Sequence, residues 1–426
     1  MERKVVIAGA VRIPFARAYT AYADRDNLAM LTAVFKSLVE RFNLKGEILG
    51  DVAAGATIKH ARDWNMAREA TLASGLDPHT PGHDLQRACG TSLTAVAELA
   101  YRIGSGEIDS GLAGGVDSMS DVPLEFGDRL QRTLVAARRA KSLGARLGAF
   151  AKLRPRDFRP ALPQVVEPLT HMSMGEHCEV MAKEWQISRQ AQDELALEGH
   201  RNAVRAWEEG FFDDLVVAPF GLERDNNVRA DTSLEKLARL PTVYDRGPQG
   251  TLTAGNSTPL TDGAAAVLLC SERWAHERGL PVLAYLTHAR TAAVDHAGLV
   301  GPREGLLMAH TYAVARLLER TQLTLQDFDF YEIHEAFSAE VLCTLKAWES
   351  EDYCAAKLKQ PGALGSIDRG KLNVKGGSVA IGHPFAATGA RLVGTLAKLL
   401  AQKGSGRGLV TVCTAGGMGV AAILER

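Results

Sequence analysis

Cys89 is the residue in this sequence that most directly suggests covalent chemistry. It lies in QRACGTSLTAVAEL (86–99), among small residues directly before a helix-like apolar pattern. Gly90, Thr91 and Ser92 suit the start of a helix, where free N–H groups and the positive end of the helix dipole stabilise a thiolate. We therefore expect a lowered pKa for this thiol, although a free cysteine in an apolar sequence is usually a small buried hydrophobe. As a nucleophile, it needs a base and a site for an oxyanion.

Three segments near the far end of the chain supply candidates for that base and that site. They carry His383 in NVKGGSVAIGHPFAATGARLV (373–393), His334 and Glu335 in YEIHEAFSAE (331–340), and Cys413 in TVCTAGGMGVA (411–421). Glycines allow the first segment to approach a ligand closely, and Pro384 fixes the turn at His383. A lone histidine is more often structural than catalytic, so each segment alone is a weak signal. GGSVAIGHP also lacks the G-x-G-x-x-G spacing of a dinucleotide-binding loop.

An α/β framework must position these residues. Short β-branched runs such as KVVIAGAV and GLVTVCTAGG alternate with helical patterns. The clearest helical pattern comes after the cysteine and repeats at intervals of three and four: Leu93, Val96, Ala100 and Ile103. One pattern occurs twice: a helix is followed by GSG and then by a strand that leads to AGG. The AGG lies at 113–115 the first time and at 415–417 the second, which indicates two related halves. Between them, at roughly 121–255, charged and proline-containing sequence predicts a large inserted region.

The composition limits the function classes. A chain of 426 residues with 46% hydrophobic content can bury more than one core, and a net charge of −1 gives no reason to expect a nucleic acid partner. The six cysteines are scattered without a C-x-x-C pair, so neither a disulfide framework nor a metal site is expected. The first residues pass directly into a strand-like run, and no stretch approaches about 18 uninterrupted apolar residues. We expect a soluble protein of a reducing, cytoplasmic compartment.

Taken together, these segments resemble the thiolase family. The motifs VVIAGAVRIPFAR, RACGTSLTAVAEL, GLAGGVDSMS, TAGNSTPLTDGAAAVLL, HEAF, GGSVAIGHPFAATGARLV and CTAGGMGVAAIL occur in the family's order and extend over the whole chain. HEAF, where many thiolases have NEAF, and a basic insert after Pro123 look most like the β subunit of trifunctional-type fatty-acid oxidation complexes, which is their 3-ketoacyl-CoA thiolase.

The resemblance implies a thiolase-like α/β fold with two similar βαβαβαββ halves packed in layers. It places the first half at 1–120 and 256–285, an inserted loop domain at 121–255, and the second half at 286–426. The implied reaction is cleavage of a 3-ketoacyl-CoA by coenzyme A, as in fatty-acid β-oxidation, which yields acetyl-CoA and a shortened acyl-CoA. CoA is then a substrate, and neither a permanently bound cofactor nor a metal is implied.

The resemblance also implies a role for each catalytic residue. Cys89 attacks the 3-keto carbonyl while His383 takes its proton, and Cys413 protonates the enolate of acetyl-CoA and then activates the incoming CoA. His383 and His334 serve the oxyanion at the thioester oxygen, with His334 binding it directly, through water, or acting only structurally. The backbone N–H groups of Cys89 and Ala415 serve the tetrahedral intermediate. Ala415 stands where the family often has glycine, which a backbone contact tolerates.

The residues that recognise CoA are harder to identify. Met174 in HMSMGEHCEVMAK (171–183) resembles a residue that packs on the pantetheine arm, and Thr258 in NSTPL matches a serine that contacts this arm. Core packing for Met174 and a turn cap for Thr258 are equally good interpretations.

Three other functions share part of this pattern. A biosynthetic enzyme that forms acetoacetyl-CoA would use every catalytic residue, so its preference for acyl chain length is what separates it. A non-catalytic acyl-CoA or lipid carrier on the same scaffold is expected to lose catalytic residues, and here all four motifs are intact. A papain-like hydrolase would need a different cysteine signature and a different chain order.

The segment 129–159 has an unusual charge, with ten Lys or Arg residues and one acid. Its apolar residues follow a helical spacing into which arginines intrude: Ala136, Ala140, Leu143, Leu147 and Phe150. We expect it to associate with anionic lipid or with the hydratase/3-hydroxyacyl-CoA dehydrogenase subunit that the resemblance implies. The resemblance also implies that the protein forms a homodimer. A solvated or self-packed insertion is an equally good interpretation, and a surface for the acidic arm of CoA is a third.

Overall fold

The computed structural model describes residues 2–161 and 166–426. The strands are β1 (Val5–Arg12), β2 (Ala16–Arg17), β3 (Asp51–Ala54), β4 (His83–Asp84), β5 (Ser110–Asp117), β6 (Glu125–Phe126), β7 (Pro160–Ala161), β8 (Thr261–Ser271), β9 (Ala284–Ala293), β10 (Phe330–Ile333), β11 (Arg407–Thr414) and β12 (Met418–Glu425). The α-helices are α1 (Asn27–Arg41), α2 (Met66–Ser74), α3 (Thr91–Ser105), α4 (Asp128–Arg139), α5 (Leu143–Phe150), α6 (Met174–Glu184), α7 (Arg189–Glu208), α8 (Leu234–Ala238), α9 (Glu272–Glu277), α10 (Ala309–Thr321), α11 (Ser338–Glu349), α12 (Glu351–Tyr353), α13 (Ser378–Ile381) and α14 (Thr388–Lys403).

Ten strands form one sheet in the order β10-β11-β12-β9-β1-β8-β5-β3-β4, with β2 paired to β8. The order is symmetric about the central β9–β1 pair. In one half β1, β8 and β5 pair antiparallel and β5 pairs parallel with β3, and in the other β9, β12 and β11 pair antiparallel and β11 pairs parallel with β10. This repeat confirms the two-half α/β architecture. β9 lies across the boundary that we predicted between residues 285 and 286.

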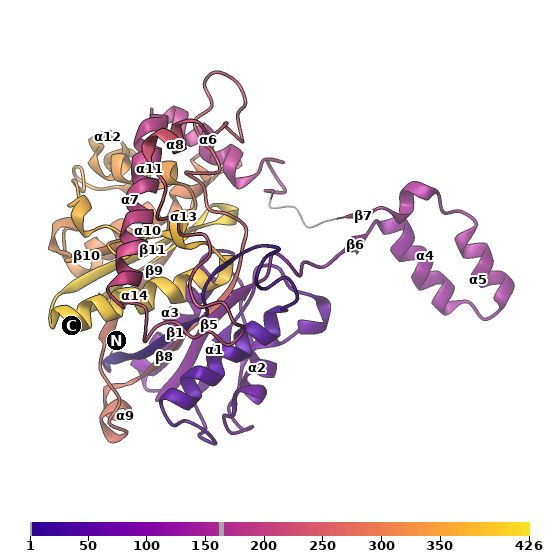
Figure 1. The fold of residues 1–426 in the computed structure, drawn as a ribbon, viewed down its shortest axis with the longest axis horizontal. Coiled ribbons are helices and arrows are strands. Elements are labelled where there is room, and N and C mark those ends of the chain that lie inside the picture. Colours follow the sequence, from indigo (N-terminus) through magenta and orange to yellow (C-terminus); the bar gives the residue numbers. More distant parts are fainter. Residues whose placement is uncertain (1, 162–165) are drawn as a thin grey trace.

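The helices form layers on the sheet (Figure 1). α1 and α2 share a buried core with β1, β3 and β8 of the first half, and α10 and α11 share another with β10, β11 and β12 of the second half. α3 and α14 contact strands of both halves and contribute to the third core. The four apolar residues predicted for one face of α3 are all fully buried.

α3 and α14 approach each other closely at their first turns. A Cβ at Gly389 would lie 2.4 Å from the backbone nitrogen of Leu93, so only glycine allows this separation. Ser92 Oγ also accepts a hydrogen bond from the N–H of Ala390 at 2.8 Å. The close contact brings the two helix N-termini, and the loops that enter them, to one place.

The region 121–255 follows β5 and precedes β8, and residues 162–165 within it lie outside the described residues. α4 and α5 form a helical hairpin that projects from the body of the molecule beyond β6 and β7 (Figure 1). The apolar stripe expected from 136 to 150 is wrong as one continuous stripe, because the chain leaves the helix at Ala140. Ser142 then caps α5 by accepting from the N–H of Ala145. Within the described ranges, no helix has the length and apolar character to cross a bilayer.

Candidate active site

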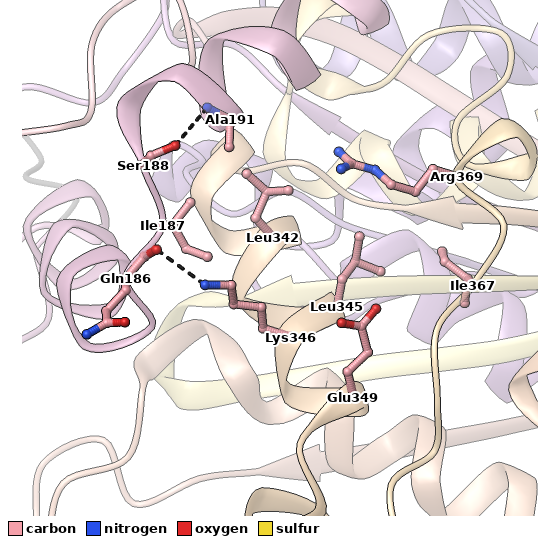
Figure 2. A pocket seen from close by; sticks show the side chains of 10 residues that line it. All are labelled: Gln186, Ile187, Ser188, Ala191, Leu342, Leu345, Lys346, Glu349, Ile367 and Arg369. Carbon is pink, nitrogen blue, oxygen red and sulfur yellow. Dashed lines mark hydrogen bonds between the residues drawn. The ribbon is translucent and has the colours of Figure 1, made fainter.

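One cavity of about 340 Å³ lies between α11 and the turn that joins α6 to α7 (Figure 2). The ten residues drawn there include no cysteine or histidine. Lys346 lines this cavity, and its ammonium group donates to the backbone carbonyls of Trp185 and Gln186. This cavity contains none of the residues that the sequence predicts to be catalytic.

Cys89 is half-buried and lies in a tight turn directly before α3. Ala88 adopts a φ of 43°, a left-handed conformation that is strained for alanine. Thr91 holds this turn, because its hydroxyl donates to the Ala88 carbonyl at 2.7 Å and accepts from the N–H of Arg87 at 2.9 Å. The turn therefore presents the thiol at the N-terminus of α3, as the sequence predicts.

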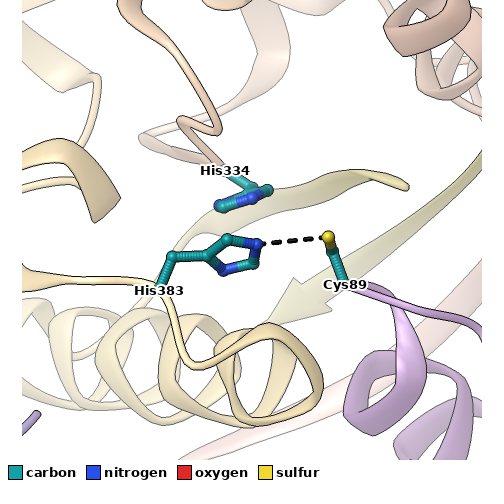
Figure 3. A group of neighbouring side chains, drawn as sticks. All are labelled: Cys89, His334 and His383. Atoms are coloured by element: carbon teal, nitrogen blue, oxygen red, sulfur yellow. Dashed lines mark hydrogen bonds between the residues drawn. The ribbon is translucent and has the colours of Figure 1, made fainter. Parts of the chain in front are cut away.

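His383 lies beside this thiol, in the loop that leads into α14 (Figure 3). Its Nε2 is 3.1 Å from Cys89 Sγ, and its Nδ1 is 2.6 Å from the hydroxyl of Thr388. Gly382 precedes it with a φ of 112°, which a residue with a side chain rarely adopts. If Nδ1 carries the proton and donates to Thr388, Nε2 is free to accept the thiol proton.

His334 directly follows β10 and is fully buried. Its ring lies 4.1 Å from that of His383, centroid to centroid, and Figure 3 shows the two rings one above the other. Its Nδ1 is 2.9 Å from the hydroxyl of Ser378, whereas its Nε2 has no hydrogen-bond partner within the described part of the chain. A ring nitrogen of each histidine and Cys89 Sγ all lie within 4.8 Å of one another.

Cys413 is the last residue but one of β11, and it lines the same cavity as Cys89 and His383. Its sulfur, a ring nitrogen of His310 and a carboxyl oxygen of Glu340 all lie within 4.8 Å of one another, and all three residues are buried. Ala415 follows in a short turn and lines the same cavity as Cys89, and its backbone N–H acts to lower the pKa of that thiol. The structure thus places Ala415 where its N–H can bind an oxyanion that forms beside the nucleophile.

Burial keeps the groups of this site neutral. It raises the pKa of Cys89 to about 12, against the opposing effect of the N–H groups of Ala415 and of Cys89 itself. Burial, with the nearby Arg391 charge, lowers the pKa of His383 to about 3, and it also lowers the pKa of His334 well below its usual value. Burial likewise raises the pKa of Cys413. The expected lowering of the Cys89 pKa is therefore wrong, because desolvation outweighs the helix N-terminus.

Six of the seven predicted residues line one cavity of about 160 Å³. Its lining includes Cys89, His383, Cys413, Ala415, Met174 and Thr258. Met174 begins α6 and is half-buried, and Thr258 Oγ1 donates to the backbone carbonyl of Ala336 at 3.1 Å. Of the predicted site residues, only His334 is absent from this lining, and its ring lies 4.1 Å from that of His383, centroid to centroid.

A larger groove of about 440 Å³ adjoins this cavity, and the two share Tyr244 and Thr258. Its lining includes the cationic side chains of Arg17, Arg229 and Lys236. Lys236 pairs with an aspartate, whereas neither arginine has an ion pair in the ranges that the structure describes. This groove was not predicted from the sequence, because its cations come from distant segments with no shared motif.

Asp117 is a further residue that the sequence analysis missed. It is buried at the end of β5 and accepts hydrogen bonds from the N–H groups of Thr57, Ile58 and Ala386 at 2.9, 2.9 and 2.7 Å. It thereby joins one wall of the cavity to the loop after His383. Burial raises its pKa to about 6. An acid at the end of a buried strand is the one sequence signal that it offers.

Comparisons with known proteins agree with this fold and site. The family models described as Thiolase, N-terminal domain and Thiolase, C-terminal domain match residues 5–273 and 280–426. The 3-ketoacyl-CoA thiolases of Yersinia pestis (strain Pestoides F) and Yersinia pseudotuberculosis (serotype O:1b, strain IP 31758) are each 40% identical to this chain, over 99% of it and 97% of their own length. The crystal structure of the Bacillus anthracis acetyl-CoA acetyltransferase covers all of this chain and 99% of its own, with a TM-score of 0.82 and 30% identity.

The sheet consists of two related halves, and Cys89 and His383 meet where the N-termini of α3 and α14 approach each other. These features define an acyltransferase of the thiolase fold. The chain belongs to the thiolase family.

Proposed function

We propose that this protein is a 3-ketoacyl-CoA thiolase of fatty-acid β-oxidation in the cytoplasm. The observation that supports this most directly is the 3.1 Å contact between Cys89 Sγ and His383 Nε2, in a cavity that Cys413 also lines. The relatives named 3-ketoacyl-CoA thiolase give the substrate class. The free state of all six cysteines is compatible with a reducing compartment.

The first half-reaction begins from a neutral thiol and a neutral imidazole. As Cys89 Sγ bonds to the C3 carbonyl carbon of the substrate, its proton passes to His383 Nε2. The N–H groups of Cys89 and Ala415 stabilise the oxyanion that forms, each by about 3–4 kcal/mol. The carbonyl then re-forms, the C2–C3 bond breaks, and its electron pair leaves as the enolate of acetyl-CoA.

The second half-reaction depends on the second cysteine. Cys413 gives its proton to C2 of the enolate, and acetyl-CoA leaves. The Cys413 thiolate then takes the thiol proton of the incoming CoA, whose sulfur attacks the acyl group on Cys89. Cys89 leaves as a thiolate and recovers its proton from His383, so the enzyme returns to its starting state.

CoA is a substrate in this proposal, and the enzyme needs no permanently bound cofactor. The groove beside the cavity suits the phosphates of CoA, because it is lined by Arg17 and Arg229, which form no ion pair with any described residue. The pantetheine arm would then pass Tyr244 and Thr258 to reach Cys89, with Met174 packing against it. Arg229→Gln is expected to raise KM for CoA several-fold, whereas Arg239→Gln, an exposed control that does not line the groove, leaves it unchanged.

A biosynthetic thiolase that forms acetoacetyl-CoA is the second candidate, supported by the likeness to an acetyl-CoA acetyltransferase. A CoA-dependent cleavage assay over a series of 3-ketoacyl chain lengths separates the two. Cleavage of long chains at rates equal to or above that of acetoacetyl-CoA supports the β-oxidation role, and activity limited to acetoacetyl-CoA contradicts it. Binding of acyl-CoA without turnover would instead support the carrier function.

We also propose that the enzyme is a homodimer that works with a hydratase/3-hydroxyacyl-CoA dehydrogenase subunit. The outermost strand β4 is two residues long and leaves a sheet edge beside α2, where Trp64 is 77% exposed. Light scattering of the purified chain gives its mass in solution. Repeating the cleavage assay with and without the dehydrogenase subunit tests whether the two enzymes associate.

The α4–α5 hairpin supports association with an anionic lipid surface. α5 has no buried side chain, and its Leu143 and Leu147 are 72% and 65% exposed. Apolar side chains surrounded by cations suit a membrane interface, where each cation contributes about 1 kcal/mol.

Replacing Arg138, Arg139, Lys141 and Arg146 with glutamine tests this association. We expect lost binding to phosphatidylserine vesicles and unchanged cleavage of a short soluble substrate. A control with Lys4, Lys36, Lys45 and Arg273 changed to glutamine should still bind. Loss of cleavage with vesicle binding intact would place the hairpin in the CoA site. If the variant lost only its co-purification with the dehydrogenase subunit, the hairpin would be a contact between subunits.

A further inference from the structure

Three buried side chains of the site, Arg391, Ser378 and His334, form a hydrogen-bonded row. The guanidinium of Arg391, on α14, donates from Nη2 to Ser378 Oγ on α13 at 2.7 Å. Ser378 Oγ is in turn 2.9 Å from His334 Nδ1. Ser378 and His334 are fully buried and Arg391 is 3% exposed, so water does not compete for these hydrogen bonds.

The protons of this row follow from the chemistry of its groups. A guanidinium carries only donors, so Ser378 Oγ must be the acceptor of the bond from Arg391. The hydroxyl proton of Ser378 then needs an acceptor of its own. Among the described residues, the other group bonded to that oxygen is His334 Nδ1. The serine therefore donates to Nδ1, which must be unprotonated.

A neutral imidazole with an unprotonated Nδ1 carries its proton on Nε2. Burial and the charges of His383 and Arg391 lower the pKa of His334, so the neutral form is the one present near pH 7. Nε2 is also the nitrogen without a partner in the described part of the chain. A buried N–H without an acceptor is costly in the free enzyme and is ready to bind an oxygen of the substrate.

The neighbouring histidine has the opposite arrangement. His383 Nε2 faces the thiol of Cys89 and acts as a base, which requires the proton on Nδ1, beside Thr388. The two neighbouring rings thus differ in tautomer, and each tautomer is set by a different hydroxyl.

We propose that Ser378, held by Arg391, fixes His334 as the Nε2–H tautomer and so makes it a hydrogen-bond donor to the enolate oxygen of the departing acetyl-CoA. Ser378 and Arg391 are positioning residues, since they act through His334. The inference rests on the proposed thiolysis, but the tautomer is a property of the free enzyme and is measured without substrate.

The test compares the whole enzyme with its Ser378→Ala variant by ¹⁵N NMR of the histidine side chains, with His334 assigned from a His334→Gln sample. In the wild type, His334 should show a protonated Nε2 and an unprotonated Nδ1. In Ser378→Ala, this preference should weaken, and kcat should fall about 10-fold or more with little change in KM. Ser378→Thr, which retains the hydroxyl, should restore both.

Ser338→Ala is the matched control, because this serine is equally buried and its hydroxyl has no hydrogen-bond partner among the described residues. It should leave the His334 spectrum and kcat unchanged. A wild-type His334 protonated on Nδ1 would overturn the proposal, as would a fall in kcat of Ser378→Ala without a change of tautomer, or the reverse. Absence of thiolysis in the wild type would refute the proposed function alone, since the tautomer is still measured.

Discussion

Cys89 and His383 show that burial decides the working form of this catalytic pair. The thiol pKa of about 12 and the imidazole pKa of about 3 mean that neither group is charged before substrate arrives. In the proposed mechanism, proton transfer is then coupled to attack, and the ion pair forms only where the oxyanion donors can stabilise it. The sequence predicted the two residues, whereas the direction of the Cys89 pKa depends on the surroundings of the folded chain.

The role of His334 predicts an effect on rate. His334→Ala should lower kcat by about 10²–10³-fold and change KM far less, because a donor to the enolate acts mainly in the transition state. Steady-state kinetics with one 3-ketoacyl-CoA measures this split. An effect confined to KM would make His334 a binding residue.

The role of Cys413 predicts a separation of the two half-reactions. Cys413→Ser should still transfer the acyl group to Cys89, at a much reduced rate, but should lose exchange of the acetyl-CoA α-protons with solvent. Proton NMR of acetyl-CoA in D₂O measures that exchange. Exchange at the wild-type rate in this variant would refute the assignment of Cys413 as the acid.

At the scale of elements, the site depends on the contact between α3 and α14. Regular apolar spacing predicted the buried face of α3, and a repeated helix, glycine and strand indicated the two halves. The break between α4 and α5 was not predicted, because a single Ser142 cap decides it within an otherwise helical pattern. Ser378 and Arg391 were also missed, since buried hydrogen bonds between distant segments leave no periodic signal.

Gly389→Ala tests this contact. The new methyl group would lie 2.4 Å from the backbone of Leu93, so α14 must move, and we expect a loss of about 1–3 kcal/mol in the free energy of unfolding together with a fall in kcat. Urea denaturation and the cleavage assay measure the two effects. Gly148→Ala, which adds its methyl group to open space on α5, is the control and should retain full activity. Equal stability of the two variants would contradict the close packing.

At the scale of the whole molecule, the fold joins residues from opposite ends of the chain. Cys89 and His383 are 294 residues apart, and their pairing was predicted from the resemblance to thiolases rather than from local pattern. The cationic groove was not predicted, because folding alone brings its arginines together. Burial of the histidines at this junction also makes the stability of the molecule depend on pH.

His383 predicts the direction of that dependence. Its folded-state pKa of about 3 lies below the ordinary value of about 6.5, so the unfolded chain binds a proton below pH 6.5 that the folded chain does not bind. Stability from this group is therefore full above pH 6.5 and falls as the pH decreases toward 3, by about 1.4 kcal/mol per pH unit. Urea denaturation at pH 7, 6 and 5 measures the free energy of unfolding of the wild type and of His383→Gln. The difference between the two values should change with pH, approaching this slope below pH 6.5. If the free energy of unfolding depended on pH in the same way in both proteins, His383 would not be a buried histidine that stays neutral.

In the proposed thiolysis, Cys89 carries the acyl group between the two half-reactions. The most direct test of this role is intact-mass spectrometry of the enzyme incubated with a 3-ketoacyl-CoA in the absence of free CoA, followed by peptide mapping. We expect one acyl group on Cys89 in the wild type, its removal when CoA is added, and neither an adduct nor thiolysis in Cys89→Ala. An acyl group on another residue, or thiolysis that persists in Cys89→Ala, would contradict the account.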